Sequence, residues 1–123
     1  MELMGLYNFE KRFVPFIRGG VKKHTIRATR EVCDKPGDTM HLYVGLRHKG
    51  AELIGRFPCV KVENILITPG GLVRIDGIYL EDDERESLAR SDGFESFAAM
   101  LAYWRAKKKG SGLPFRGKIF HWK

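Results

Sequence analysis

Alternating hydrophobic and polar positions predict strands over much of the chain, and turn residues separate them. The expected strands are residues 3–8, 23–28, 39–44, 51–67, 72–80 and 115–122. Within the second strand, Thr25 and Arg27 lie on the same side, because side chains alternate along a strand. Pro58 has no backbone N–H, so it predicts a break or an edge position in the longest strand.

Three helices are predicted, two from hydrophobic residues at helical spacing and one from a charge-rich run without Gly or Pro. A short first helix is expected over residues 10–18, and Gly19 and Gly20 end it. Residues 81–90 are rich in charge, and their acidic side chains gather at the N-terminal end, where the helix dipole favours anions. Residues 94–107 form the clearest helix. Its buried stripe is expected to hold Phe94, Phe97, Leu101 and Trp104.

These elements predict an α+β fold, because the strands follow one another too closely for parallel βαβ units. We expect a small, mostly antiparallel β-barrel, with one early helix and a late helical pair that flank a cleft. The chain of 123 residues has the length of one domain, so residues 1–123 are expected to form a single domain.

Charge is distributed unevenly along the chain. The formal net charge is +7, which favours a phosphate-bearing partner. Residues 1–61 carry 12 basic and 6 acidic side chains, residues 62–93 carry 3 and 8, and residues 94–123 carry 7 and 1. Two basic ends therefore flank an acidic middle, and one face becomes strongly positive if the ends fold together.

The remaining composition argues against several classes of protein. Cys33 and Cys59 form no CxxC pair, so neither a thiolate zinc site nor a secreted disulfide scaffold is expected. No apolar run approaches the roughly 20 residues of a membrane-spanning helix, and the first residues do not resemble a cationic signal peptide. We therefore expect a cytoplasmic protein without a membrane partner.

The segment from residue 16 to residue 27 holds the densest set of reactive side chains. Gly19 and Gly20 would let the backbone approach an anion. Lys22 or Lys23, lying among other cations, would lose pKa on burial and act as a base. A threonine hydroxyl needs such a base to become a nucleophile, and Arg27 suits a phosphate or carboxylate. The same residues also fit a helix end followed by a polar edge strand.

The pattern Lys22-x-x-Thr25-x-Arg27, followed by the turn at residues 35–38, resembles the ASCH domain family, a relative of the PUA fold. The acidic-Gly-Phe stretch over residues 89–97 and the final strand over residues 115–122 are also similar, so the resemblance spans nearly the whole chain. It implies a PUA-like β-barrel with a helix-lined cleft, of a kind generally associated with RNA.

Some small bacterial members of that family are amidohydrolases that remove the acyl group from N4-acetylcytidine. The resemblance implies that their catalytic Lys and Thr correspond to Lys22 and Thr25, with Lys23 replacing Lys22 if the register slips by one. Their catalytic Glu falls on or beside Asp92, where the carboxylate is one methylene shorter. Lys22 would deprotonate Thr25, and Asp92 would orient the lysine. Arg27 and the amides near Gly19 and Gly20 are the candidates for stabilising the oxyanion.

A purely structural role for Asp92 is also predicted. Residues 92–95 have the pattern of a capping box, with Asp92 as N-cap of the last helix and Glu95 at the third helical position. A cap side chain tied to backbone amides would have little freedom to orient a lysine, so the two roles compete.

Other candidate contacts are weaker. Arg116, Lys118 and Trp122 alternate near the end of the chain, and this pattern would suit base stacking and phosphate contacts with RNA. The four histidines (His24, His41, His48 and His121) show no metal-binding spacing, so we expect no metal and no cofactor. The expected partner is RNA or a modified nucleoside. A hydrolase, a non-catalytic RNA-binding module and a ribonuclease remain alternatives.

Overall fold

The computed structural model describes residues 5–29, 34–46, 49–106 and 112–123. Residues 3–4, 107, Cys33 and His48, which entered the predictions above, lie outside these ranges. The elements in chain order are β1 (Leu6–Phe9), the 3-10 helix η1 (Lys11–Phe13), α1 (Val14–Arg18), β2 (His24–Ala28), β3 (Thr39–Val44), β4 (Glu52–Ile67), β5 (Val73–Ile75), β6 (Ile78–Tyr79), α2 (Asp82–Ser91), α3 (Phe97–Ala106) and β7 (Phe115–Trp122).

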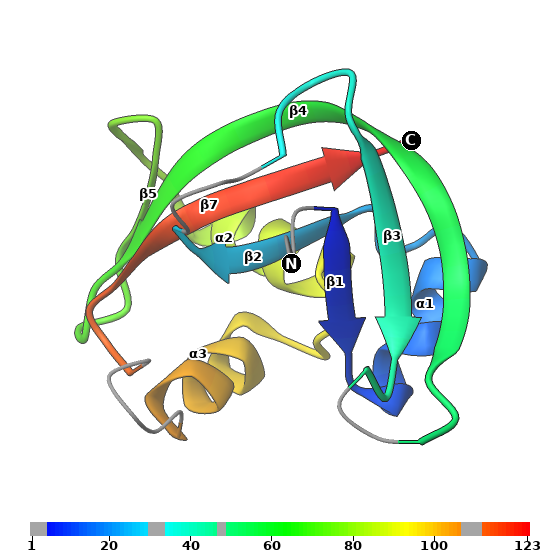
Figure 1. Ribbon diagram of the computed structural model, residues 1–123. Helices are drawn as coiled ribbons and strands as arrows, with labels where there is room; N and C mark the ends of the chain where they lie inside the picture. Colours follow the sequence, from blue (N-terminus) through cyan, green and yellow to red (C-terminus); the bar gives the residue numbers. More distant parts are fainter. Residues whose placement is uncertain (1–4, 30–33, 47–48, 107–111) are drawn as a thin grey trace.

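One long strand organises the fold. Strand β4 arches over the other strands, and the helices lie beneath the arch (Figure 1). Its first part pairs with β3, which also pairs with β1, and its second part pairs with β5 and β7. Strand β2 pairs with the other edge of β7, and β6 pairs with β5. Every pairing is antiparallel except that of β1 with β3.

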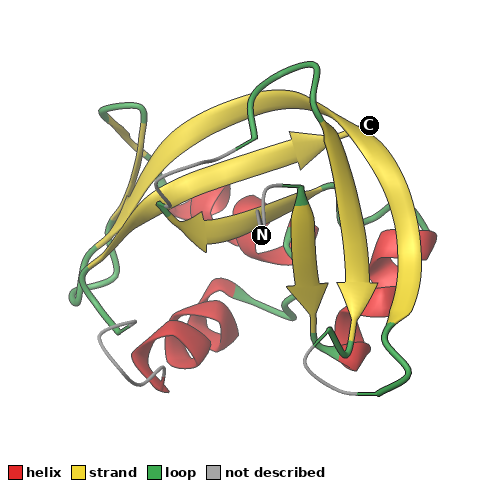
Figure 2. Cartoon of the chain, viewed as in Figure 1, coloured by secondary structure: helices red, strands yellow, loops and turns green. Residues whose placement is uncertain are grey.

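The predicted α+β class and mostly antiparallel sheet are confirmed, and the predicted closed barrel is wrong. The described strands form one open sheet in which β1 and β6 end the path and β2 lies on a branch beside β7 (Figure 2). A barrel would need these outer strands to pair with one another. None of the helices in the described part of the chain is long and apolar enough to cross a membrane.

Pro58 does not break the long strand, contrary to one expectation. It lies opposite Thr39, at the end of the β3 pairing, and the next residue, Cys59, already pairs with Trp122 of β7. The register shifts between Cys59 and Lys61. The missing N–H of proline therefore falls where β4 changes partners, and the strand continues through a bulge.

The strand expected over residues 72–80 is a hairpin. Asp76 and Gly77 both have positive φ, of 48° and 84°, between the paired residues Ile75 and Ile78. An Asp-Gly pair in this conformation is a strong signal for a tight two-residue hairpin turn, and the hydrophobic pattern alone does not show it.

The capping box predicted at Asp92 is also wrong. The box lies eleven residues earlier, where Glu81 caps α2 and Glu84 accepts a hydrogen bond from the Glu81 backbone N–H at 2.8 Å. Asp92 is the C-cap of α2, and Gly93 follows with φ of 100°, the left-handed conformation that commonly ends helices. Ser96 caps α3 instead, since its hydroxyl accepts the Ala99 N–H at 3.1 Å. The Asp92 side chain is therefore not committed to an N-cap.

Candidate functional site

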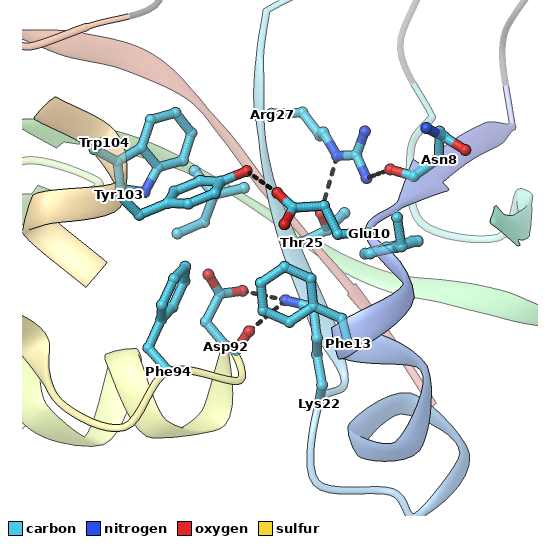
Figure 3. A pocket seen from close by; sticks show the side chains of 12 residues that line it. Asn8, Glu10, Phe13, Lys22, Thr25, Arg27, Asp92, Phe94, Tyr103 and Trp104 are labelled. Atoms are coloured by element: carbon cyan, nitrogen blue, oxygen red, sulfur yellow. Dashed lines mark hydrogen bonds and ion pairs between the residues drawn. The ribbon is translucent and has the colours of Figure 1, made fainter. Parts of the chain in front are cut away.

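A pocket of about 360 Å³ lies where β1, β2, the end of α2 and the helix α3 meet. This volume is within the range of small-molecule sites. It combines polar side chains with aromatic walls (Figure 3). The lining residues are Asn8, Phe9, Glu10, Phe13, Lys22, Thr25, Ile26, Arg27, Asp92, Phe94, Tyr103 and Trp104.

Lys22 and Asp92 form a buried ion pair in this pocket. Their exposed fractions are 3% and 5%. The Lys22 ammonium group donates to Asp92 Oδ1, and it also donates to the Asp92 main-chain oxygen at 2.7 Å. The turn that ends α2 brings both acceptors to the lysine, although 70 residues separate the two side chains in sequence.

Burial controls how this pair ionises. It outweighs the attraction of Asp92 and lowers the pKa of Lys22 below its ordinary value. Burial also acts to raise the pKa of Asp92, but the charge of Lys22 and the nearby His24 outweigh it and hold that pKa below its ordinary value. The site therefore combines an ionised carboxylate with a lysine that releases its proton more readily than an exposed one.

The structure leaves no room for a side chain at Gly93, the residue after Asp92. A Cβ at this position would lie 2.8 Å from Cδ1 of Phe13, and the φ of 100° strains any other residue. We expect Gly93→Ala to lower the free energy of unfolding by about 1–3 kcal/mol, because both the backbone strain and the clash must be relieved. Urea unfolding measures this loss. Gly37→Ala is the matched control, because Gly37 also has a φ of 100° but an added Cβ there meets nothing within 4 Å. An equal loss in the two variants would contradict the contribution of Phe13.

Thr25 and Arg27 project from β2 into the same pocket. The Thr25 side chain is buried, and its Oγ1 accepts a hydrogen bond from Arg27 Nε at 2.9 Å. Arg27 Nη2 donates to the Asn8 main-chain oxygen at 2.7 Å, which orients the guanidinium group. A positive donor on a hydroxyl oxygen stabilises the alkoxide form, so this contact favours deprotonation of Thr25.

Tyr103 and Glu10 meet at the solvent-exposed side of the pocket, which we call its mouth. The Tyr103 hydroxyl of α3 donates to Glu10 Oε2 at 3.0 Å, and Figure 3 shows this contact beside Thr25. Burial and the adjacent Glu10 raise the pKa of Tyr103 to about 12, so the phenol remains a donor at physiological pH. No sequence pattern indicates this pair, because 93 residues separate its members.

Arg12 covers the aromatic wall next to this mouth. Its guanidinium carbon lies 4.6 Å from the ring centre of Phe13, 5.3 Å from that of Phe94 and 5.4 Å from that of Tyr103. Its Nε lies 3.2 Å from Glu10 Oε1. These distances are typical of cation–π contacts, so the rings of this wall attract a flat cation.

Several residues predicted for the site do not join the pocket. Lys23 is exposed and does not line the pocket, whereas Lys22 does, so the geometry favours Lys22 of the two candidate lysines. Gly19 and Gly20 also lie outside the lining. Their amides donate to Pro15 O at 2.9 Å and Ile17 O at 3.2 Å, so neither is available for an oxyanion. The two glycines end α1 and turn the chain toward β2.

The three residues predicted for base stacking and phosphate contacts do not form one surface. Trp122 is 3% exposed and packs against Phe9 and Phe57, so it has no free face for a base, contrary to expectation. Arg116 is exposed and lines a second pocket of about 260 Å³ together with Arg74. Lys118 is half-buried and lies opposite Arg27 in the register of β7 and β2.

The described part of the chain contains no group of three or more His, Cys, Asp or Glu residues placed to hold a metal ion. Comparison with known proteins found no matching family model, no matching curated protein and no matching solved structure.

Proposed function

We propose that this protein is an amidohydrolase of the ASCH type, with a PUA-like fold, which removes the acyl group from N4-acetylcytidine or a related acylated pyrimidine. One observation carries the proposal: the buried Lys22–Asp92 pair and the Thr25 hydroxyl line the same pocket. A lysine with a lowered pKa in the same pocket as a threonine hydroxyl is a combination that suits nucleophilic catalysis. The net charge and the free, buried Cys59 fit the cytoplasmic location that we propose with it.

In the proposed reaction, neutral Lys22 takes the proton of Thr25 as Oγ1 attacks the amide carbonyl carbon. The carbon–nitrogen bond then breaks, Lys22 returns the proton to the departing amino group, and cytidine leaves. Water attacks the acyl-threonine ester and gives a proton to Lys22. The bond to Oγ1 breaks, the proton on Lys22 passes to Thr25 Oγ1, and acetic acid leaves and releases its own proton to solvent. Asp92 remains ionised throughout and holds Lys22 in place.

The aromatic wall and the mouth suit the base of such a substrate. Phe13 and Phe94 supply apolar surface for a flat ring. When a base enters between them, the Tyr103 hydroxyl would turn from Glu10 and donate to the edge of the base, and the Glu10 carboxylate would accept from it. A pyrimidine carries both kinds of atom.

Purified protein incubated with N4-acetylcytidine tests the proposal, with cytidine release followed by chromatography. Lys22→Ala and Thr25→Ala are run alongside, and Lys35→Ala is the control, because Lys35 is exposed and lies outside the pocket lining. We expect release by the wild type and the control only. If the wild type releases no more cytidine than the two pocket variants, the amidohydrolase assignment is wrong.

Tyr103→Phe is expected to raise KM for N4-acetylcytidine about three- to tenfold, with kcat changed less than twofold. The change removes one hydrogen-bond donor to the base and leaves Lys22 and Thr25 in place. Steady-state kinetics measure both constants. Tyr79→Phe is the matched control, since Tyr79 is exposed on β6 and outside the pocket lining. A fall in kcat with unchanged KM would contradict a role in binding.

A basic row favours a second candidate, binding of RNA. In the registers of β2, β7, β4 and β5, Arg27 pairs with Lys118, while Arg116 and Arg74 both pair with Leu66. Paired residues and alternate residues share a face, so the four cations form a row that leads from the pocket. The row lies on the same face of the sheet as Thr25.

Salt dependence separates the two candidates. Binding of single-stranded RNA by this row would weaken with salt, with a slope of log K near −0.7 for each phosphate neutralised. Hydrolysis of a free nucleoside would change little with salt. The affinity of the protein for a labelled single-stranded RNA, and any cleavage of that RNA, are measured for the wild type, Arg116→Ala and the control Lys35→Ala. Comparison with hydrolysis of the free nucleoside shows whether the protein acts on RNA or on the nucleoside.

A further inference from the structure

His24 is a buried polar residue next to the Lys22–Asp92 pair, and the proposed reaction does not use it. It lies on β2 between Lys22 and Thr25 and is 5% exposed. Its Nε2 lies 3.2 Å from Asp92 Oδ1, the oxygen that also accepts from Lys22. Within the described part of the chain, this nitrogen makes no hydrogen bond of acceptable geometry. A buried polar atom so close to an acceptor, yet misaligned with it, calls for an explanation.

The chemistry of the two groups determines where the hydrogen lies. An ionised carboxylate can only accept hydrogen bonds. Nε2 facing Asp92 therefore carries a hydrogen, because a lone pair aimed at a carboxylate oxygen would be repelled. A small rotation of either side chain would align this N–H with Oδ1.

The ring of His121, on the neighbouring strand β7, packs against the ring of His24. The ring centre of His121 lies 5.5 Å away, and His121 Nε2 lies 2.6 Å from Glu63 Oε1. Lys61 lies 3.4 Å from the other oxygen of Glu63. Among the residues that the structure describes, the charged and titratable groups near the Lys22–Asp92 pair and His24 include Arg27 on β2, His121 on β7, and Lys61 and Glu63 on β4.

We propose that His24 is a positioning residue that shares Asp92 with Lys22 and takes over the carboxylate when Lys22 is neutral. This inference rests on the proposed function for its catalytic meaning. When Lys22 gives up its proton, Asp92 loses its cationic partner inside the protein. A buried carboxylate without a donor is costly, and that cost would keep Lys22 protonated. The His24 N–H reduces this cost, so Lys22 becomes a base more easily.

Two substitutions distinguish this role from simple packing. His24→Phe keeps a ring against His121 but removes the donor. His24→Gln loses the ring but keeps an N–H donor at about the same reach. Sharing of Asp92 predicts that the Gln variant resembles the wild type, whereas packing predicts that the Phe variant does.

The pKa of Lys22 is measured directly by NMR, from the shift of its ε-carbon with pH, and Lys22→Arg identifies the signal. We expect this pKa to rise by about one unit in His24→Phe and to change much less in His24→Gln, because a hydrogen bond to a charged group is lost only in the first. An unchanged pKa in His24→Phe, or an equal rise in both variants, would overturn the inference. If urea unfolding shows that His24→Phe is not folded, His24→Met supplies the donor-free case.

The pH dependence of kcat/KM is a second test, and its outcome can be separated from that of the NMR titration. In His24→Phe the rise of kcat/KM with pH is expected to move to higher pH, in step with the pKa of Lys22. If the wild type hydrolyses no acylated nucleoside, the proposed function fails. The NMR titration needs no substrate and still decides whether His24 acts on the Lys22–Asp92 pair.

Discussion

Replacing Thr25 by Ala is expected to lower kcat for hydrolysis of N4-acetylcytidine by about a thousandfold or more, because the reaction loses its nucleophile. Thr25 is suited to this role by its burial in the pocket and by the hydrogen bond that Arg27 Nε donates to its oxygen. Steady-state kinetics with chromatographic detection of cytidine measure the loss.

Thr25→Ser is the matched control, because serine keeps the hydroxyl and loses only a methyl group. We expect this variant to retain activity within about tenfold of the wild type, since a small displacement of the reacting atom is its main defect. Equal activity of the Ala and Ser variants would contradict the role of the hydroxyl and would indicate direct attack by water.

The second large effect concerns stability. Asp92→Ala is expected to lower the free energy of unfolding by about 3–5 kcal/mol, because it leaves the Lys22 ammonium group buried without its ionic partner. Urea unfolding followed by circular dichroism measures the change.

The double variant Lys22→Met/Asp92→Leu is the control for this effect. Replacing both members of a buried pair by apolar residues is often nearly neutral, so most of the lost stability is expected to return. A double variant as unstable as Asp92→Ala would assign the loss to the helix end instead of the ion pair.

Acid should weaken the same pair. The pKa of Asp92 is below its ordinary value of 3.8 in the folded protein, so the folded state releases this proton more readily than the unfolded chain. Its contribution to stability is therefore complete above the ordinary pKa and is lost as pH falls through the folded value. We expect the urea midpoint to fall below about pH 4, and to fall less steeply in Asp92→Asn. Parallel curves for the two proteins would contradict this contribution.

Hydrophobic pattern alone predicted most of the elements, because burial of alternate side chains dominates local structure. The final strand, residues 115–122, has the predicted bounds. Local turn chemistry accounts for the errors. Asp76 and Gly77 fold one expected strand into a hairpin, and Gly93 makes Asp92 the end of a helix instead of the start. Closure of the barrel depends on pairing between distant strands, which a local pattern does not determine.

In the candidate site too, residues that are close in sequence were predictable, and residues joined only by the tertiary fold were not. Lys22, Thr25 and Arg27 share one short segment, so their spacing alone showed that they form a group. The resemblance to a known family brought in Asp92, and the structure adds its contact with Lys22. Glu10, Tyr103 and the position of His24 beside Asp92 depend on tertiary contacts, and no sequence spacing indicates them.

A single-turnover experiment tests the central claim most directly. Wild-type protein in excess over N4-acetylcytidine is compared with Lys22→Ala, and the cytidine formed is measured over time. The proposed reaction predicts complete conversion by the wild type and little or none by the variant. Equal release by the two proteins, or none by the wild type, would contradict the proposal that this pocket hydrolyses the amide.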